Sequence, residues 1–596
     1  MQYLVLRAGR RRVLNYRTVI LHARYKSVNG AKPQPSGSAN FGTPLPADLH
    51  PDVPGTPAYY LQQDLEMSEG GITGQLLRVI GVYKRALQVF ALSGTIVCVG
   101  YVLAFMGSHA WTEHYELAPE EDPTGELQRW GWNLEVERWS GGDQGGTDQG
   151  LGIRARHSVR AAWMAQRWGS FLPSEIDSVA RSRQEDGKAT SEHLEEADGL
   201  LKTALAVMYK KMSDAATKGK TANFRQGTAA ALLSRNAEIL ELIGTRVALL
   251  EARDKYKQVW DELDKKDLES ARIAMKLGHV FSRLGDNDEA ISWLSKSLQL
   301  VSPNPSNDQG ESQRERPLQT LTMLPKMPLA QRLFSSILTS LSAVYAQSGR
   351  LQDASAVQEI GLALLKTKAD KDVDQANSPD AGIAISPSHT LHELFLLHRA
   401  SILSMHNTEV SYVLHTANLD SSTKSLVQVA ALSEQIASIL VGSIPQRVMQ
   451  SDGCSSKPVS FISNTPLDKS YSSSKTLKKP ASNLLRDTRR TVVEACIMQG
   501  VLYDSQLGKD ESAMQALECY EKAIRWAGID GNAAGEMSQH GDLLLEDESQ
   551  SLWRSYVYAR EKVERLRRQD IRNKSSNTPD TQSTLSSFKI EFKPTT

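Results

Sequence analysis

Few residues in this chain have side chains that could do chemistry together, and their spacing does not assemble a catalytic site. His392-Glu393, followed by His398, is similar to a zinc-protease motif. That motif needs its second His four residues after the first, because this spacing places both imidazoles on one face of a helix. Position 396 is Leu, so the pattern favours an ordinary surface helix over a metal site.

A glycine-rich run, SGGDQGGTDQGLG at residues 140–152, could hold a phosphate on its backbone N–H groups. A P-loop also requires Gly-Lys-Ser/Thr and a preceding strand, and neither is present. Gly187-Lys188 lacks the upstream glycines and the following hydroxyl residue of the same motif. Six of the ten tryptophans lie between Trp111 and Trp168. We therefore interpret the run as a structural loop that seats tryptophans against the first helices.

The cysteines do not form a recognisable framework. Cys98, Cys454, Cys496 and Cys519 are too few and too irregularly spaced for a disulfide scaffold or a zinc site. Cys496 and Cys519 fall in one predicted helix pair, but the twin CX3C and CX9C spacings of the mitochondrial intermembrane space are absent. We interpret both as packing residues, and the sequence leaves open whether they form a disulfide.

Amino-acid composition further limits the classes of function that the chain could have. The 596 residues have a formal net charge of zero, which argues against a nucleic-acid binder because such proteins carry a basic surplus. Aromatic residues are scarce at 6%, and Leu and Ala dominate the apolar residues, as in helical proteins. The sequence thus predicts a mostly helical protein that is not an enzyme, with no catalytic residue, metal, cofactor or small-molecule substrate.

One stretch, residues 86–106, is long and apolar enough to cross a membrane. It contains no charged residue, and a helix of this length spans a hydrocarbon layer of about 30 Å. The alternative is a buried helix of a globular core, but such a helix seldom continues for six turns without a polar face. Lys84 and Arg85 precede the stretch and several acidic residues follow it, which places its N-terminal side in the more negative compartment.

The N-terminal region predicts a mitochondrial address. Residues 1–47 carry many Arg and Lys but no Asp or Glu, as presequences do. We interpret 1–27 as the presequence and 28–85, which includes a run rich in Pro, Gly and Ser, as a linker on the matrix side. The alternative for the N-terminus is a disordered basic arm that binds phosphate or a membrane. On this topology the C-terminal domain faces the intermembrane space from the inner membrane.

Three stretches share the internal offsets of a tetratricopeptide (TPR) repeat, in which small residues let paired helices approach and large residues fill the space between them. They are residues 271–303, 338–365 and 494–528, the last with a four-residue insertion. The residues at the packing offsets are Leu277, Gly278, Phe281 and Ala290 in the first unit, Leu341, Tyr345, Gly349 and Ala354 in the second, and Gly500, Tyr503, Ala516, Tyr520 and Ala523 in the third.

The sequence predicts an all-α fold: a TPR-like solenoid of helical hairpins with one N-terminal transmembrane helix and disordered insertions. A Trp- and Gly-rich connecting segment covers 107–160, the TPR-like domain covers 161–568, and a disordered tail covers 569–596. Further helices are expected at 194–212, 249–263, 391–403 and 431–442. Linkers are expected near 302–328 and 367–389, and a disordered insertion near 449–482. The first helices of the pairs should line a partner-binding groove, whose residues the sequence does not identify.

A resemblance joins these features. The basic N-terminus, the single anchor, the degenerate repeats and the block WSGG…GGTD…GLG…RH.VRAAW…Q.WG within residues 129–169 together resemble the fungal TPR-containing adaptor of the mitochondrial i-AAA protease. The resemblance implies a non-catalytic inner-membrane protein. Its TPR domain would bind unfolded or misassembled proteins in the intermembrane space and deliver them to the protease, so the protease and its substrates would be the partners.

Two other readings share part of this pattern. A TPR-type assembly factor for a respiratory-chain complex would have the same presequence, anchor and topology, but it would bind folded subunits. An outer-membrane import receptor would carry its anchor at the very N-terminus, whereas here 85 residues precede it. No charged cluster recurs at a fixed spacing, so we predict that capture depends on groove shape and on apolar segments of the substrate.

Overall fold

The computed structural model describes residues 72–122, 125–136, 138–169, 188–221, 223–264, 267–302, 323–373, 389–414, 419–442, 466–506, 510–528 and 546–576. These residues belong to two compact units that meet in the sequence between Leu117 and Ala118. The predicted presequence 1–27, most of the linker 28–85, the centres of the three insertions and the end of the tail lie outside the described residues.

The first unit contains the long helix α4 (Ile72–Trp111), followed by the short π-helix η1 (Thr112–Glu116). Helix α4 extends beyond both ends of the predicted span 86–106 and includes the end of the predicted linker. Among the described residues, the stretch Val79–Glu116 alone is long and apolar enough to cross a membrane. Ser93 and Thr95 donate their hydroxyls to carbonyls of the same helix, so these two hydroxyls need no outside partner.

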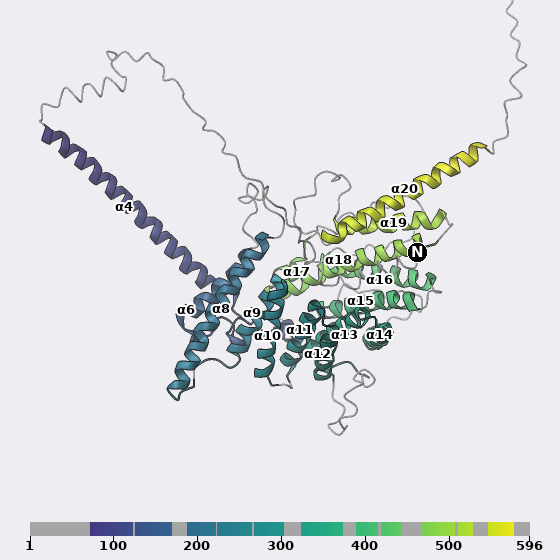
Figure 1. Ribbon diagram of the computed structural model, residues 1–596, viewed down its shortest axis with the longest axis horizontal. Coiled ribbons are helices and arrows are strands. Elements are labelled where there is room, and N and C mark those ends of the chain that lie inside the picture. The colour runs from purple at the N-terminus through teal and green to yellow at the C-terminus, as the bar shows by residue number, and fades with distance from the viewer. Residues whose placement is uncertain are drawn as a thin grey trace, which may run out of the picture. The chain divides into compact units, whose positions relative to one another are not determined.

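The second unit is a succession of helices (Figure 1). No strand occurs among its described residues, and the predicted all-α solenoid fold is confirmed. It begins with α5 (Glu126–Arg129), the 3-10 turns η2 (Gly142–Gln144) and η3 (Gln149–Leu151), α6 (Gly152–Trp168) and α8 (Lys188–Thr217). The helix pairs that follow are α9 (Thr228–Ile243) with α10 (Arg246–Glu262), α11 (Leu268–Leu284) with α12 (Asn287–Val301), α13 (Pro328–Gln347) with α14 (Leu351–Val373), and α15 (Leu391–Leu414) with α16 (Leu419–Leu440). The last elements are α17 (Lys469–Ser472), α18 (Lys475–Asp504), α19 (Asp510–Ala527) and α20 (Glu546–Ser576).

Small residues allow the paired helices to approach each other. A Cβ atom added to Gly278 would lie 2.6 Å from Cγ of Leu294, which no real contact allows. A Cβ atom at Gly500 would lie 2.8 Å from the ring of Tyr520 in the same way. Gly285 ends α11 with a φ angle of 89°, a left-handed conformation that favours glycine. These positions explain why the helix pairs carry glycine at the repeat offsets.

The structure places most of the predicted packing residues inside the unit. Gly349 is exposed and has a φ angle of 79° in the turn between α13 and α14, and Tyr503 is partly buried. The others are buried, namely Leu277, Gly278, Phe281, Ala290, Leu341, Tyr345, Ala354, Gly500, Ala516, Tyr520 and Ala523.

Several predicted boundaries differ from the structure. Helix α6 starts at Gly152, before the predicted domain start at 161, and α20 continues to Ser576, beyond 568. The part of the predicted disordered insertion between 466 and 482 is ordered and mostly helical. Ser474 caps α18 by accepting a hydrogen bond from the N–H of Leu477, and Leu477 itself is buried. A capped helix start with a buried apolar residue outweighs the Ser- and Lys-rich composition that indicated disorder.

Candidate protein-binding face

The first helices of successive pairs, α9, α11, α13, α15 and α18, form what we call the first-helix face. Helix α11 contacts α13, α13 contacts α15 and α15 contacts α18, and α9 lines a pocket together with α11 and α13. Residues 120–150, the crossing segment, contact the N-terminal halves of α18, α13, α11 and α9 in that order, which is opposite to the order of the pairs. Glu120 meets the start of α18, where its Oε2 accepts hydrogen bonds from the hydroxyl of Ser474 and the N–H of Thr476. From Ala118 on, the predicted connecting segment 107–160 belongs to the second unit.

Arg332, near the start of α13, binds the centre of the crossing segment. Its side chain is 2% exposed. The guanidinium donates to the carboxylate of Glu135 at 2.7 Å and to the backbone carbonyls of Trp130 and Gly131 at 2.8 and 3.3 Å. It also lies 3.7 Å above the ring of Trp132. Burial lowers the pKa of Arg332 and the adjacent Glu135 raises it, so this buried cation depends on the crossing segment for its charge partner.

His392 completes this cluster from α15. Its Nδ1 accepts a hydrogen bond from Arg332 at 3.1 Å, so its Nε2–H is the donor to Gln331 at 3.0 Å. The ring stacks on Trp130 with a centroid distance of 4.9 Å. His398 instead contacts Thr491 on α18. Both histidines are buried, so the prediction of a surface helix is wrong, and each binds a different partner within the core.

Apolar residues hold the same part of the crossing segment in place. Leu127 and Trp132 are buried in a core cluster with residues of α15, α16 and α18. The other buried members of the cluster are Leu391, Leu394, Ile436, Ala437, Leu440, Leu477, Ala481, Leu484 and Leu485. The segment therefore completes the core beneath three helices that are far from it in the sequence.

The glycine-rich run forms the second attachment of the crossing segment. A Cβ atom at Gly141 would lie 2.0 Å from the carbonyl oxygen of Gly145, so the loop is too tight for any other residue there. The carboxylate of Asp148 accepts hydrogen bonds from the Thr228 hydroxyl at 2.6 Å and the Arg225 N–H at 2.8 Å. Trp139 is buried, and the guanidinium of Arg235 on α9 lies 5.1 Å from its ring. The run thus seats a tryptophan against a helix, the role that the sequence favours over phosphate binding.

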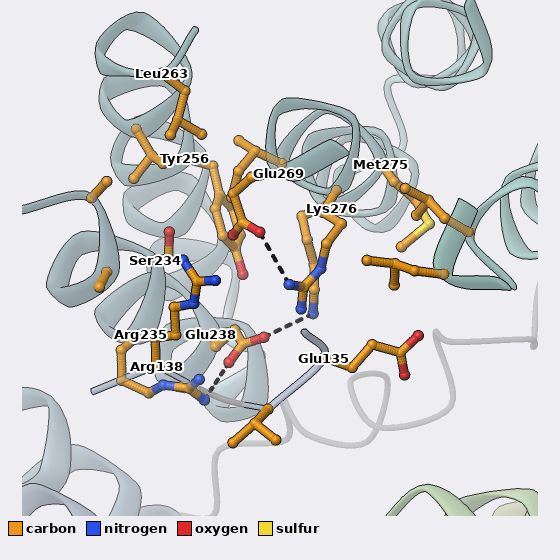
Figure 2. A pocket seen from close by; sticks show the side chains of 18 of the residues that line it. Glu135, Arg138, Ser234, Arg235, Glu238, Tyr256, Leu263, Glu269, Met275 and Lys276 are labelled. Carbon is orange, nitrogen blue, oxygen red and sulfur yellow. Dashed lines mark hydrogen bonds and ion pairs between the residues drawn. The ribbon is translucent and has the colours of Figure 1, made fainter. Parts of the chain in front are cut away.

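Between its two attachments, the crossing segment lines a pocket of about 340 Å³ formed mainly by α9, α10, α11 and α13 (Figure 2). The sides of the pocket are charged, and apolar residues such as Ile273, Leu329 and Leu333 also line it. Figure 2 shows Glu238 between the side chains of Arg235 and Lys276, with an ion pair to each. The charged lining residues are Glu135, Arg138, Arg235, Glu238, Glu269, Arg272, Lys276 and Arg332.

The basic residues of the pocket act together on Glu238. Burial alone would raise the pKa of Glu238, but Arg235, Lys276 and Arg272 lower it to about 2. Sequence analysis missed this cluster because its members come from three helices and the crossing segment, at no regular spacing. Scattered Arg and Lys residues along the predicted helical domain were its only signal.

The cysteines in the α18–α19 pair lack the features of reactive thiols. Cys496 and Cys519 are both free thiols. Burial raises the pKa of Cys496 to about 12 and that of Cys519 to about 11. Neither thiol has the lowered pKa of a reactive cysteine. Among the described residues, no three His, Cys, Asp or Glu side chains gather in a group that could hold a metal ion.

Comparison with known proteins identifies one part of the solenoid. The tetratricopeptide repeat family matches residues 271–300, which cover most of the α11–α12 hairpin. No curated protein sequence matches the chain. The solved structure of BtubC (BKLC) from P. vanneervenii aligns at 13% identity over 52% of this chain and 99% of that chain, with a TM-score of 0.27, too low to support an argument. The chain therefore contains a TPR hairpin within a helical solenoid, a type of structure whose general partners are proteins.

Proposed function

We propose that this chain is a non-catalytic adaptor of the mitochondrial inner membrane. Helix α4 anchors it, the solenoid lies in the intermembrane space, and the solenoid binds unfolded or misassembled proteins for a membrane-bound i-AAA protease. The observation that carries the proposal is that one chain joins an apolar span directly to a TPR-type solenoid. The resemblance of the 129–169 block to the i-AAA adaptor supports the choice of partner.

The mechanism requires no chemistry from the adaptor itself. Anchoring confines the solenoid to the membrane that holds the protease, and this confinement raises the effective concentration of captured protein near the proteolytic ring. The crossing segment follows α4 in the sequence without a long linker and is bound along the solenoid from α18 to α9. A force applied to the membrane helix would therefore be distributed over several helices of the solenoid.

The test is a pull-down of the tagged full-length chain from gently solubilised mitochondria, with mass spectrometry of the recovered proteins. A bait with the same membrane helix fused to an unrelated soluble domain serves as the control. We expect the i-AAA protease among the dominant partners of the full chain and not of the control. Recovery of respiratory-complex subunits without the protease would overturn the proposal in favour of an assembly factor.

The topology has its own test. In mitoplasts, whose outer membrane is opened, added protease should degrade a C-terminal tag on the chain, whereas in intact mitochondria the tag should be protected. A tag that stays protected in mitoplasts until the inner membrane is lysed would place the solenoid in the matrix and contradict the proposed location.

A further inference from the structure

The pocket beneath the crossing segment has a surplus of positive charge. Five basic residues and three acidic residues line it, and the described part of the chain supplies them from α9, α11, α13 and the crossing segment. Apolar side chains lie beside these charges. A volume of about 340 Å³ falls at the lower end of ligand pockets, which is enough for a few side chains of a bound segment.

A contact within the chain shows which side chains the first-helix face can bind. At the edge of the pocket, Arg332 takes the carboxylate of Glu135 and the indole of Trp132 from the crossing segment at the same time. The two residues are three positions apart in a turn, in which the N–H of Glu135 donates to the carbonyl of Trp132 at 3.0 Å. A carboxylate next to a large apolar side chain is thus a combination that the first-helix face already accommodates.

Lys276 and Arg272 on α11 are placed to receive a second carboxylate. The ammonium of Lys276 lies 3.4 Å from Glu238 and 3.5 Å from Glu241, at long range for ion pairs, and its side chain is 32% exposed. Arg272 pairs with Glu269 on its own helix at 3.1 Å and is equally exposed. Arg138, on the crossing segment, is exposed and lines the same pocket. Partly exposed pairs of this kind exchange partners at little cost.

We propose that this pocket binds partner segments in which a carboxylate adjoins a large apolar side chain, with Lys276, Arg272 and Arg138 facing the carboxylate. The inference rests on the proposed function and names the class of segment that the adaptor captures. The crossing segment is part of the site, because it supplies Arg138 and Glu135 to the wall. Unfolded proteins expose such acid-and-apolar segments in many sequences, so the site needs no single motif.

The experiment measures binding to the full chain in detergent micelles by fluorescence anisotropy. The probe is a labelled twelve-residue peptide with two Leu and two Glu in a Gly/Ser background, and the control peptide has Gln in place of both Glu. We expect the Glu peptide to bind at least tenfold more tightly at low salt and to lose this advantage as salt rises. Equal affinity of the two peptides at low salt would overturn the proposal.

A matched pair of variants locates the site. The double variant Lys276→Gln with Arg138→Gln removes two charges from the pocket and should weaken binding of the Glu peptide about tenfold. The control double variant, Lys210→Gln with Lys424→Gln, removes two exposed charges that do not line the pocket and should bind as the wild type does. Equal loss in both variants would show nonspecific charge attraction and overturn the site. If the pocket variant does not fold, the salt dependence of the two peptides on the wild-type chain decides.

The outcome separates this inference from the proposed function. If the protease is recovered in the pull-down but the peptides bind equally, the adaptor role stands and the pocket is not its capture site. If the Glu peptide binds at the pocket but no protease is recovered, the binding site stands and the adaptor role falls.

Discussion

The α11–α12 hairpin and the crossing segment are stabilised in opposite ways. The hairpin packs through residues close in sequence, such as Gly278 against Leu294 and the Ser297 hydroxyl against the Ala271 carbonyl at 2.7 Å. The crossing segment has almost no regular structure and is held by Arg332, which lies 197 residues from its partner Glu135. Local spacing therefore determines the first region, and charge pairs and aromatic contacts between distant residues determine the second.

Arg332→Met should have the largest effect. It removes the charge partner of Glu135 and the donor to two carbonyls, and a broken buried ion pair costs about 3–5 kcal/mol of unfolding free energy. Arg350→Met, which breaks an exposed pair with Asp353 on α14, is the matched control and should cost under about 1 kcal/mol. Chemical denaturation of both variants measures the difference. Equal midpoints would mean that Arg332 does not hold the crossing segment.

Gly278→Leu tests the packing of the α11–α12 hairpin. The new side chain has no room beside Leu294, and overpacking of this kind costs about 1–3 kcal/mol of unfolding free energy or more. Gly199→Leu on α8 is the control, because a Cβ atom there meets nothing within 4 Å and a helix gains stability when it loses a glycine. Thermal unfolding should therefore shift in opposite directions in the two variants. A Gly278→Leu variant that unfolds at the wild-type temperature would contradict the close packing.

The residues changed in these two variants differ in whether their contacts can be predicted from the sequence. Gly278 and its neighbours recur at fixed offsets, so periodicity alone predicts a hairpin there and an all-α solenoid around it. The pairing of Arg332 with Glu135 follows no period, and it arises only when the chain returns over its own helices. The positive pocket is hidden for the same reason, because Arg235 and Lys276 belong to different pairs. Sequence analysis therefore predicts the scaffold but not the surface that the crossing segment builds on it.

Acid should loosen the crossing segment before it affects the hairpin. Burial lowers the pKa of His398 to about 3 and that of His406 to about 4, and both lie in α15, whose Leu391 and Leu394 pack with Leu127 and Trp132 of the segment. Because the unfolded histidine titrates near pH 6.5, this stabilisation is complete above pH 6.5 and is lost as pH falls towards the folded values. The loss is about 2 kcal/mol per histidine at pH 5.

Hydrogen exchange at pH 7 and pH 5 measures this difference region by region. Protection should fall in α15 and in residues 127–135 while α11 and α12 keep theirs. Titration of Glu238 does not contribute to the difference between pH 7 and pH 5, because its lowered pKa affects stability only below its ordinary value of 4.5. Equal loss of protection in the hairpin and in α15 would show that the solenoid responds to acid as a single unit.

Ser297→Ala should have the smallest effect, and it sharpens the comparison because Ser297 is as buried as Arg332. The change removes the hydroxyl that donates to Ala271, but that carbonyl keeps its hydrogen bond within α11, and alanine fits the same space. A neutral buried hydrogen bond contributes about 0.5–1.5 kcal/mol, so we expect a urea midpoint only slightly below that of the wild type. If the loss matched that of Arg332→Met, the hairpin would also depend on single polar contacts. The contrast between a hairpin that relies on local apolar packing and a segment that relies strongly on the buried Arg332 would then fail.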